Sequence, residues 1–319
     1  MMPNRFCLLF AVFLPLSILA QQADSLLKKK MVYQDYLYLN NIYKGSQNPT
    51  AISREALENV AEINVSYRYA FGDYHAMDES NIQKTLDFSL YGIKKFKKVA
   101  FEGEIAYSNI SEQDKRWNST LFIAEDNPFV IADSIYSNFG TEKFHLNGGF
   151  SYEPTSNLHI GLRADYQVGS TANQTDPRPL VDGMRFYLNP GIDYQLGQFT
   201  IGLSGRVEWM SEASAYTVVR TTEGAYYAFL FHGLGDPVMK SIIGYQRKYS
   251  GNLGGGNIQL IWQNNRFKNF FEAGLQKSIE EAEDGGDAEK YKGGKYKASQ
   301  YGFTDIFMIY GDKWIHNLN

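Results

Sequence analysis

Apolar and polar residues alternate with a period of two along most of the chain after residue 59. The alternation is clearest at 158–169, where Leu, Ile, Ala, Tyr and Val face one way and His, Gly, Arg, Asp and Gln the other. This alternation fits a β-strand with one apolar face and excludes a helix, whose period is about 3.6 residues. Two similar strands are predicted at 185–195 and 199–209, and Pro190 predicts an irregularity in the first of them.

Weaker alternation predicts further strands, which gives ten in all. They lie at 61–69, 86–94, 99–107, 142–152, 257–263, 270–278 and 301–310. The final run, 314–319, has the pattern of a strand that stops early. Because closed bacterial barrels normally have an even number of strands, we expect a C-terminally truncated member of a longer family, or a sheet that does not close by itself.

The predicted connections alternate between short and long. Short turns fall at 95–98, 154–156, 197–198, 264–266 and 311–313, and long segments at 71–81, 111–141, 170–182, 211–242 and 279–297. Outer-membrane barrels have short periplasmic turns on one rim and long extracellular loops on the other. The predicted fold class is therefore all-β, an antiparallel up-and-down transmembrane β-barrel of about ten strands that is incomplete at its C-terminus.

One register can be predicted from the turn at 154–156. If Tyr152 pairs with Leu158, His145 lies opposite Asp165. The same register places Asn147 opposite Arg163.

The first 20 residues resemble a secretory signal, with Arg5 before an apolar run at 6–14 and a small residue, Ala20, at the cleavage position. We therefore divide the chain into a signal peptide (1–20), a periplasmic N-terminal segment (21–59) and an outer-membrane barrel domain (60–319). The pattern at 26–39 fits a short amphipathic helix. The only cysteine, Cys7, lies in the signal, which excludes disulfides, a lipid-modified N-terminal cysteine and thiolate metal sites in the mature chain.

Composition supports a barrel. Aromatic residues make up 15% of the chain, yet the mean hydropathy of -0.37 is that of a polar protein. A barrel reconciles these values because only every second strand residue has to be apolar, whereas a soluble domain of this size needs continuous apolar runs. The net charge of -4 and the absence of a basic footprint argue against a nucleic-acid partner.

Charged residues on the polar strand faces are the candidate site, because they face the lumen if the apolar faces meet lipid. They are Arg68, Glu102, Glu104, Lys143, His145, Arg163, Asp165, Arg185, Asp193, Arg206, Glu208 and Glu272. One interpretation is a pore lining that selects by charge. The other, which we favour, is a lumen filled by cross-strand ion pairs and hydrogen bonds.

No motif predicts catalysis, a metal site or a cofactor. The five histidines lack HExxH spacing, and no GxSxG element is present. The acidic run at 280–289 lacks the spacing of an EF-hand and fits a solvated extracellular loop. The glycines at 251–256 lack the Lys and Ser/Thr of a phosphate loop and fit a bend in a sheet. We expect no enzyme activity, no metal and no cofactor.

Several short motifs carry a resemblance to a known family. They are Asn48-Pro49-Thr50-Ala51, Trp117-Asn118, Glu142, Thr175-Asp176-Pro177-Arg178-Pro179, and Tyr249-Ser250-Gly251 followed by Gly254, Gly255, Gly256 and Gln259. The chain resembles an uncharacterised (domain of unknown function) family of outer-membrane β-barrels of Gram-negative bacteria, whose members are longer. The resemblance implies location and architecture, and it brings no catalytic or binding residue with it.

Three hypotheses for function follow. The first is an outer-membrane barrel, a porin-like pore or an accessory to surface assembly, whose partners are outer-membrane lipids and the barrel-assembly machinery that inserts it. The second is a secreted soluble β-barrel or sandwich that binds a small ligand. The third is a membrane hydrolase with a site on its outer rim. The direction of the side chains separates the first two: a membrane barrel should point Ile160, Leu162, Ile201 and Leu203 outward, and Arg163 and Arg206 inward.

Overall fold

The structure is a computed structural model of the chain. It describes residues 41–43, 45–54, 59–220, 226–233, 237–242, 244–285, 290–310 and 315–318. The predicted signal peptide and the predicted helix at 26–39 lie outside these residues. Among the described residues, no helix is long and apolar enough to cross a bilayer.

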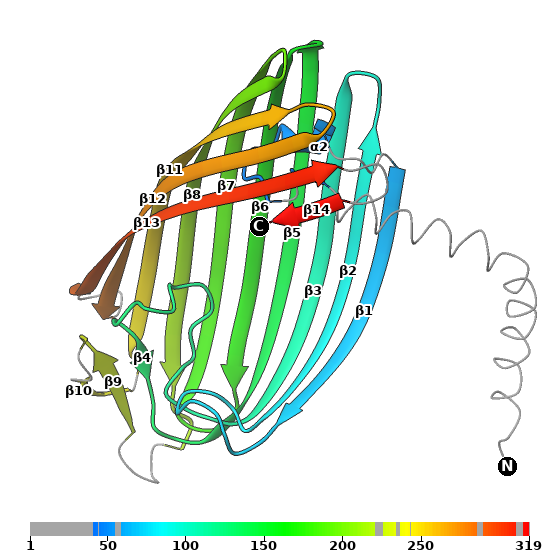
Figure 1. Cartoon of the computed structure of the whole chain (residues 1–319). Coiled ribbons are helices and arrows are strands. Elements are labelled where there is room, and N and C mark those ends of the chain that lie inside the picture. The colour runs from blue at the N-terminus through cyan, green and yellow to red at the C-terminus, as the bar shows by residue number, and fades with distance from the viewer. Residues whose placement is uncertain are drawn as a thin grey trace, which may run out of the picture.

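One curved antiparallel sheet of eleven strands dominates the molecule (Figure 1). Its strands, in spatial order, are β1 (Asn59–Phe71), β2 (Ile82–Lys95), β3 (Val99–Lys115), β5 (Ser137–Thr155), β6 (Leu158–Asn173), β7 (Arg178–Leu196), β8 (Phe199–Thr217), β11 (Gln246–Gln263), β12 (Phe267–Gly285), β13 (Lys290–Tyr310) and β14 (Ile315–Leu318). Apart from three short strands in the connections, each strand pairs with the next along the chain. The predicted up-and-down arrangement and the ten predicted strands are confirmed, and the run at 314–319 supplies the four-residue β14.

Three short strands form a separate small sheet within two of the long connections. They are β4 (Ile131–Ala132), β9 (Tyr227–Phe231) and β10 (Pro237–Ser241), in the order β10-β9-β4. Buried Ile131, Leu230 and Ile242 pack around the ring of Tyr216, which anchors this sheet to the end of β8.

The strands are longer than the alternation predicted. The connection predicted at 170–182 shrinks to 174–177, and the one predicted at 279–297 shrinks because β12 continues to Gly285 and β13 begins at Lys290. The interpretation of the acidic run as a solvated loop is therefore wrong for 280–285, which lie in β12. Outside the lipid-facing part of a strand both faces can carry polar residues, which ends the alternation. The backbone hydrogen bonds between strands do not depend on the alternation, and the pairing therefore continues past it.

The predicted register between β5 and β6 is wrong by two positions. Tyr152 pairs with Ile160, and a bulge between Tyr152 and Thr155 takes up the difference. The bulge contains Pro154, which has no N–H group for the ladder, and the two-residue turn at 156–157 joins Thr155 to Leu158. The irregularity predicted at Pro190 is present, because the ladder between β7 and β8 omits this residue and its neighbour Asn189.

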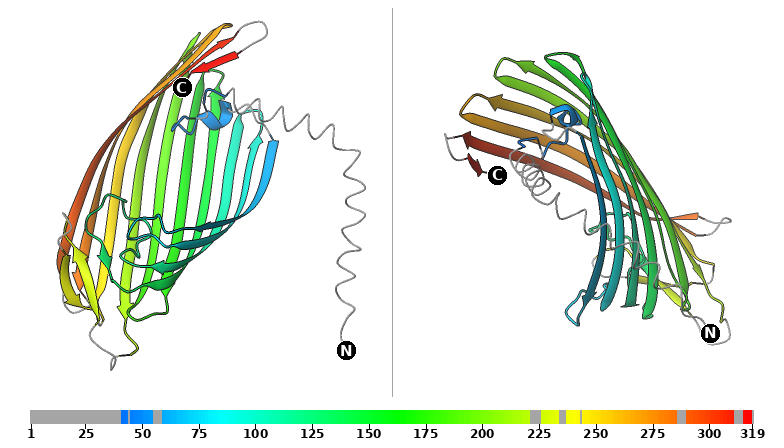
Figure 2. Two further views of the ribbon diagram at one scale, coloured as in Figure 1. Left: turned by 60° about the horizontal axis from the view of Figure 1, so that its bottom comes forward. Right: turned by 90° about the vertical axis from the view of Figure 1, so that its right-hand side faces the viewer.

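The two faces of the sheet differ in chemistry. On the convex face Ile160, Ile201 and Leu203 are 42%, 45% and 54% exposed, and Leu162 is half-buried. Arg163 and Arg206 lie on the opposite, concave face and make ion pairs there. The short helix α2 (Ala51–Arg54) lies against the concave face, as two views show (Figure 2). This is the direction of side chains expected of a membrane barrel.

The edges of the sheet are β1 and β14, which do not pair with each other in the part of the chain that the structure describes. We call the end of the sheet with the short turns the inner end, and the end with the long connections the outer end.

Candidate functional site

A segment from before β1 lies against the concave face at the inner end. We call Ser46–Arg54 the docked segment; it contains α2. Asn48 is 1% exposed, and its Nδ2 donates to the carbonyl oxygens of Ile192 (3.2 Å) and Leu203 (3.3 Å). Its Oδ1 accepts from the backbone N–H of Thr50 at 3.1 Å. One asparagine thus connects the docked segment to two neighbouring strands and also shapes the turn into α2.

Four glycines on adjacent strands make room for this segment: Gly149, Gly161, Gly191 and Gly202. A Cβ atom at Gly161 would lie 2.7 Å from the backbone carbon of Pro49. A Cβ atom at Gly191 would lie 2.2 Å from Oδ1 of Asn48. Because these distances are too short for a Cβ atom, Gly161 allows the backbone of the docked segment to approach its strand, and Gly191 makes room for the side chains of Asn48 and Pro49.

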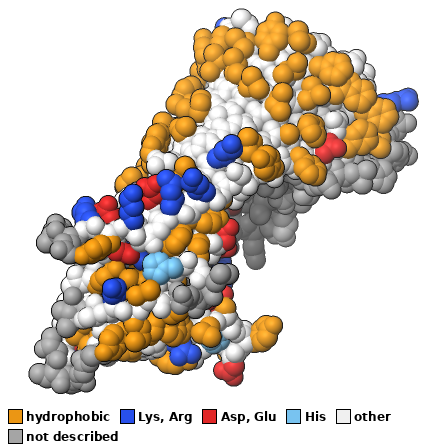
Figure 3. Space-filling view, turned by 90° about the vertical axis from the view of Figure 1, so that its left-hand side faces the viewer, with side chains coloured by type: hydrophobic (Ala, Val, Ile, Leu, Met, Phe, Trp, Pro, Cys, Tyr) orange, Lys and Arg blue, Asp and Glu red, His pale blue; other side chains and the backbone are white. Residues whose placement is uncertain are grey.

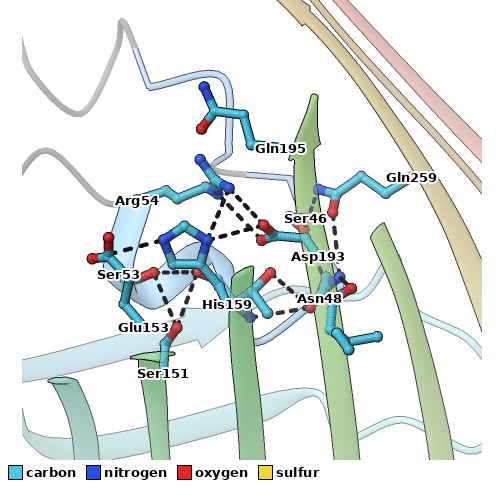
Figure 4. A network of polar contacts seen from close by, with 12 residues as sticks. Ser46, Asn48, Ser53, Arg54, Ser151, Glu153, His159, Asp193, Gln195 and Gln259 are labelled. Atoms are coloured by element: carbon cyan, nitrogen blue, oxygen red, sulfur yellow. Dashed lines mark hydrogen bonds and ion pairs between the residues drawn. The ribbon is translucent and has the colours of Figure 1, made fainter. Parts of the chain in front are cut away.

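A buried ion pair fixes the end of α2. The guanidinium of Arg54 donates from Nη2 to Oδ1 of Asp193 (2.5 Å) and from Nε to Oδ2 (3.2 Å). Nδ1 of His159 lies 3.0 Å from Nη2 of Arg54 and 3.1 Å from Oδ1 of Asp193 (Figure 4). Burial disfavours the charged guanidinium and is the largest single effect, but the hydrogen bond to Asp193, the charge of that carboxylate and the interaction with Tyr43 together outweigh it and raise the pKa of Arg54. The pair is bidentate, the geometry in which Arg and a carboxylate bind most strongly.

Residues of β11 and β12 also hold the docked segment on the concave face. The carboxylate of Glu272, on β12, accepts from the backbone N–H of Gln47 (3.1 and 3.2 Å) and from Oγ of Ser46 (3.2 Å). Nε2 of Gln259 donates to Oγ of Ser46 at 3.0 Å. The segment therefore bridges strands from β5 to β12 across the concave face.

A cavity of about 490 Å³ lies beside the docked segment. Its polar lining is rich in amides and comprises Gln47, Asn257, Glu272, Gln276, Gln300 and Thr304. Side chains of this type can donate and accept hydrogen bonds without carrying charge.

Paired charges fill the middle of the concave face. Nη2 of Arg163 lies 2.6 Å from Oε1 of Glu102. Nε2 of His145 lies 2.5 Å from Oδ2 of Asp165, which also accepts from Nδ2 of Asn147 at 2.8 Å. These are cross-strand pairs between β3, β5 and β6, of the kind that satisfies buried charge.

A second charged cluster lies on β7 and β8. Glu208 accepts from Arg206 (2.5 Å) and pairs with Arg185 (3.1 Å). The guanidinium carbon of Arg206 lies 4.1 Å from the ring centroid of Tyr187, within the range of a cation–π contact.

Most of the residues predicted to face the lumen take part in these contacts on the concave face. Lys143 lies there too, with Nζ 5.8 Å from the ring centroid of Phe122. Arg68 and Glu104 make no ion pair with another described residue, and Arg68 lies exposed on the edge strand β1.

At the outer end, part of the long connection between β3 and β5 folds onto the concave face. We call Leu121–Phe129 the folded-in loop. Glu212 accepts from the backbone N–H groups of Leu121 (3.1 Å) and Phe122 (2.7 Å). Glu280 accepts from the backbone N–H of Ala124 (3.1 Å) and from Nδ2 of Asn127 (2.6 Å). Two carboxylates from the sheet thus hold the loop by its backbone.

A buried arginine holds the far end of the folded-in loop. Arg247 is 0% exposed, and its Nη2 donates to Oδ2 of Asp284 at 2.8 Å. The carbonyl oxygen of Phe129 accepts from Nη1 of Arg247 (3.0 Å) and from the hydroxyl of Tyr249 (2.9 Å). Glycine again allows close approach, because a Cβ atom at Gly183 would lie 2.7 Å from the ring of Phe122.

Sequence reasoning missed both segments that cover the concave face. The available signal was the glycines at polar-face positions of consecutive strands, Gly161 and Gly202 among them, since glycine inside a strand marks close approach of another backbone. The resemblance motifs gave a second signal, because Asn48-Pro49-Thr50-Ala51 is the centre of the docked segment.

The described residues hold no group of three His, Cys, Asp or Glu side chains placed to bind a metal ion. The hydrogen bonds of His159 reach Arg54 and Asp193 at the inner end, and within the described residues none reaches a serine. This cluster is therefore an anchor for the docked segment and lies at the opposite end from an outer-rim hydrolase site.

The fold and the concave face together define the wall of an outer-membrane type of β-barrel. The chain belongs to the family of unknown function DUF6850, whose model matches residues 49–319. No curated protein is detectably similar in sequence.

Several solved outer-membrane structures are similar in part. The ferric preacinetobactin receptor BauA from Acinetobacter baumannii is 11% identical, with a TM-score of 0.42, and the match covers 79% of this chain and 40% of the receptor. The ferric citrate transporter FecA is 10% identical with a TM-score of 0.42, and the match covers 81% of this chain and 38% of the transporter. The toluene transporter TodX from Pseudomonas putida is 10% identical with a TM-score of 0.35, and the match covers 84% of each chain. The chain spans well under half the length of the first two, and likenesses this low assign it no substrate.

Proposed function

We propose that the chain forms the wall of a β-barrel in the outer membrane of a Gram-negative bacterium, with a transport-type role in which passage is gated. The observation that carries the proposal is the opposition of the two faces: exposed apolar side chains on the convex face, and ion-paired, hydrogen-bonded charges on the concave face.

The convex face supports the membrane location. Large exposed side chains occur on nearly every long strand, for example Phe144, Tyr166, Leu203 and Leu260. Soluble monomers rarely expose contiguous apolar patches of more than about 600 Å². A continuous apolar surface around a polar inside is the pattern of a barrel in lipid, and it disfavours a secreted soluble protein whose apolar faces meet in a core.

The concave face supports gating. The docked segment covers it at the inner end and the folded-in loop at the outer end, and each is held by buried charged groups. A solute crossing along this face has to displace or pass both. This arrangement fits a closed passage that opens on a signal, and it fits a permanently open diffusion pore poorly.

Cysteine labelling tests the membrane location, since the only native cysteine lies in the predicted signal. In outer membranes washed with carbonate, Leu275→Cys on the convex face should resist a water-soluble maleimide, whereas its neighbour Gln276→Cys, which lines the cavity, should react. Recovery of the protein in the soluble fraction, or the reverse labelling pattern, would refute the assignment.

Conductance in planar bilayers tests the gate. The full chain should conduct little, and Gly191→Val should raise conductance because its side chain would occupy the position of Asn48. Gly148→Val is the matched control, because a Cβ atom there meets nothing within 4 Å. Equal conductance of the wild type and both variants would contradict a role of the docked segment in gating.

A further inference from the structure

Six lysines gather on the convex face of β11, β12 and β13 near the outer end. This lysine patch comprises Lys248, Lys277, Lys290, Lys292, Lys295 and Lys297. Figure 3 looks at this side of the molecule and shows Lys, Arg, Asp and Glu side chains gathered beside an extensive hydrophobic surface. Four of these lysines fall in the long connection predicted at 279–297, but the structure places them on β13.

The strand register puts these lysines side by side. Glu283 pairs with Lys248 on one neighbouring strand and Lys292 on the other. One step nearer the inner end, Glu281 pairs with Lys295. The next convex position, Ile279, pairs with Lys297. The lysines therefore form a compact group across three adjacent strands.

The patch has an excess of positive charge that its own acids do not neutralise. Two glutamates share its face, and they make ion pairs from Glu281 to Lys295 and from Glu283 to Lys290. Six lysines against two glutamates leave a balance of +4, which stays positive even if Asp287 and Glu289, which follow in the sequence, are counted. Among the described residues, Lys277, Lys292 and Lys297 have no ion-pair partner. A solvated ladder of ion pairs would not need this surplus.

The patch lies where the apolar surface ends. On β12 the convex residues Phe271, Leu275 and Ile279 are exposed and apolar, and Glu281 is the next convex residue. The nine residues from Phe271 to Ile279 extend about 26 Å along the strand, and a tilted strand needs about nine to eleven residues to cross a bilayer. Lys277 lies within this stretch, where its aliphatic stem can follow the apolar surface while the ammonium reaches the interface. The lysines therefore lie at the level of lipid headgroups.

We infer that the lysine patch binds the phosphate groups of a phosphorylated outer-leaflet lipid. The inference rests on the proposed membrane location. Ammonium groups beside an anionic lipid surface gain about 1 kcal/mol each, which corresponds to about fivefold in affinity. The apolar band directly below the patch would hold the acyl chains of the same lipid.

Lipid titration tests this inference with the purified full chain in phosphatidylcholine vesicles. Lys277→Gln/Lys292→Gln/Lys297→Gln should bind bisphosphorylated lipid A about a hundredfold more weakly than the wild type, at about fivefold for each lysine. The control is Lys94→Gln/Lys97→Gln/Lys98→Gln, which removes the same charge from exposed lysines at the inner end and should bind as the wild type does.

Three outcomes would overturn the inference. They are unchanged binding by the patch variant, equal binding of lipid A that lacks its phosphates, and displacement of lipid A by millimolar inorganic phosphate, which would indicate a site for free anions. All use protein already inserted in vesicles, so they are separate from failure of the proposed function, which would appear as soluble protein on fractionation.

Discussion

Nη2 of Arg54 lies 2.5 Å from Oδ1 of Asp193, and this ion pair joins positions 139 residues apart in the chain. Arg54 belongs to the docked segment and Asp193 to the concave face of β7. Both side chains are nearly buried, at 11% and 2% exposure. Removing one partner therefore leaves a charge buried without its counter-ion, which is far more costly than removing both.

Arg54→Ala should release the docked segment. Breaking one side of a buried pair costs about 3 to 5 kcal/mol, so backbone amides of 46–54 should lose protection in hydrogen exchange. The double variant Arg54→Met/Asp193→Leu should recover part of the loss because no charge remains unpaired. Arg68→Ala is the control, because Arg68 is exposed and makes no ion pair with another described residue. Retained protection in Arg54→Ala would show that the glycine contacts alone hold the segment.

Gly161→Ala should destabilise the protein although it adds only a methyl group. The new Cβ would lie 2.7 and 2.8 Å from backbone atoms of Pro49 and Thr50, which cannot move aside as a flexible side chain could. Overpacking of this kind costs about 1 to 3 kcal/mol, to be measured by urea unfolding in detergent micelles. Gly140→Ala has open space around it and should change stability little. Equal stability of the two variants would contradict close docking at Gly161.

Glu212→Ala should free the folded-in loop at the outer end. The substitution leaves the backbone N–H groups of Leu121 and Phe122 without their acceptor, at about 1 to 3 kcal/mol for each unsatisfied group. Chymotrypsin added to intact cells should then cut at Phe122 or Phe129 faster than in the wild type. Glu62→Ala, on the exposed face of β1, should not change the rate. An unchanged cleavage rate in Glu212→Ala would show that Glu280 and Arg247 suffice.

The small sheet of β4, β9 and β10 should become less stable as the pH rises. Burial raises the pKa of the Asp133 carboxyl from 3.8 to about 6, and the hydrogen bond from the N–H of Ile135 offsets only part of this. Since the folded pKa is the higher one, the contribution to stability is complete below about pH 4 and is lost as the pH rises through about 6.

Asp133→Asn should remove this dependence. At pH 8 the variant should protect the amides of β4 and β9 better than the wild type, by up to about 3 kcal/mol for a shift of about two pKa units. The two proteins should converge near pH 4, where the aspartate is neutral as well. Weaker protection of the variant at pH 8 would show that the charged form is the stabilising one.

The pair His145 and Asp165 shows how far sequence reasoning reaches. The predicted register, which set them directly opposite, is wrong, because the bulge after Tyr152 moves Gln167 opposite His145. The two side chains nevertheless meet at 2.5 Å as diagonal neighbours. Alternation had assigned both to the same face correctly, and diagonal positions on one face of a sheet remain within reach of long side chains.

Alternation along the chain determined where the strands lie, although not their full lengths, which face of each strand is apolar and in what order the strands pair, because these properties depend only on neighbouring residues and on short connections. The docked segment and the folded-in loop were decided by tertiary structure alone. Asn48 and Gly191, or Phe122 and Gly183, lie too far apart in sequence for any local pattern to join them. Their contact depends on the curvature of the whole sheet, which brings strand glycines and buried carboxylates together on one concave surface.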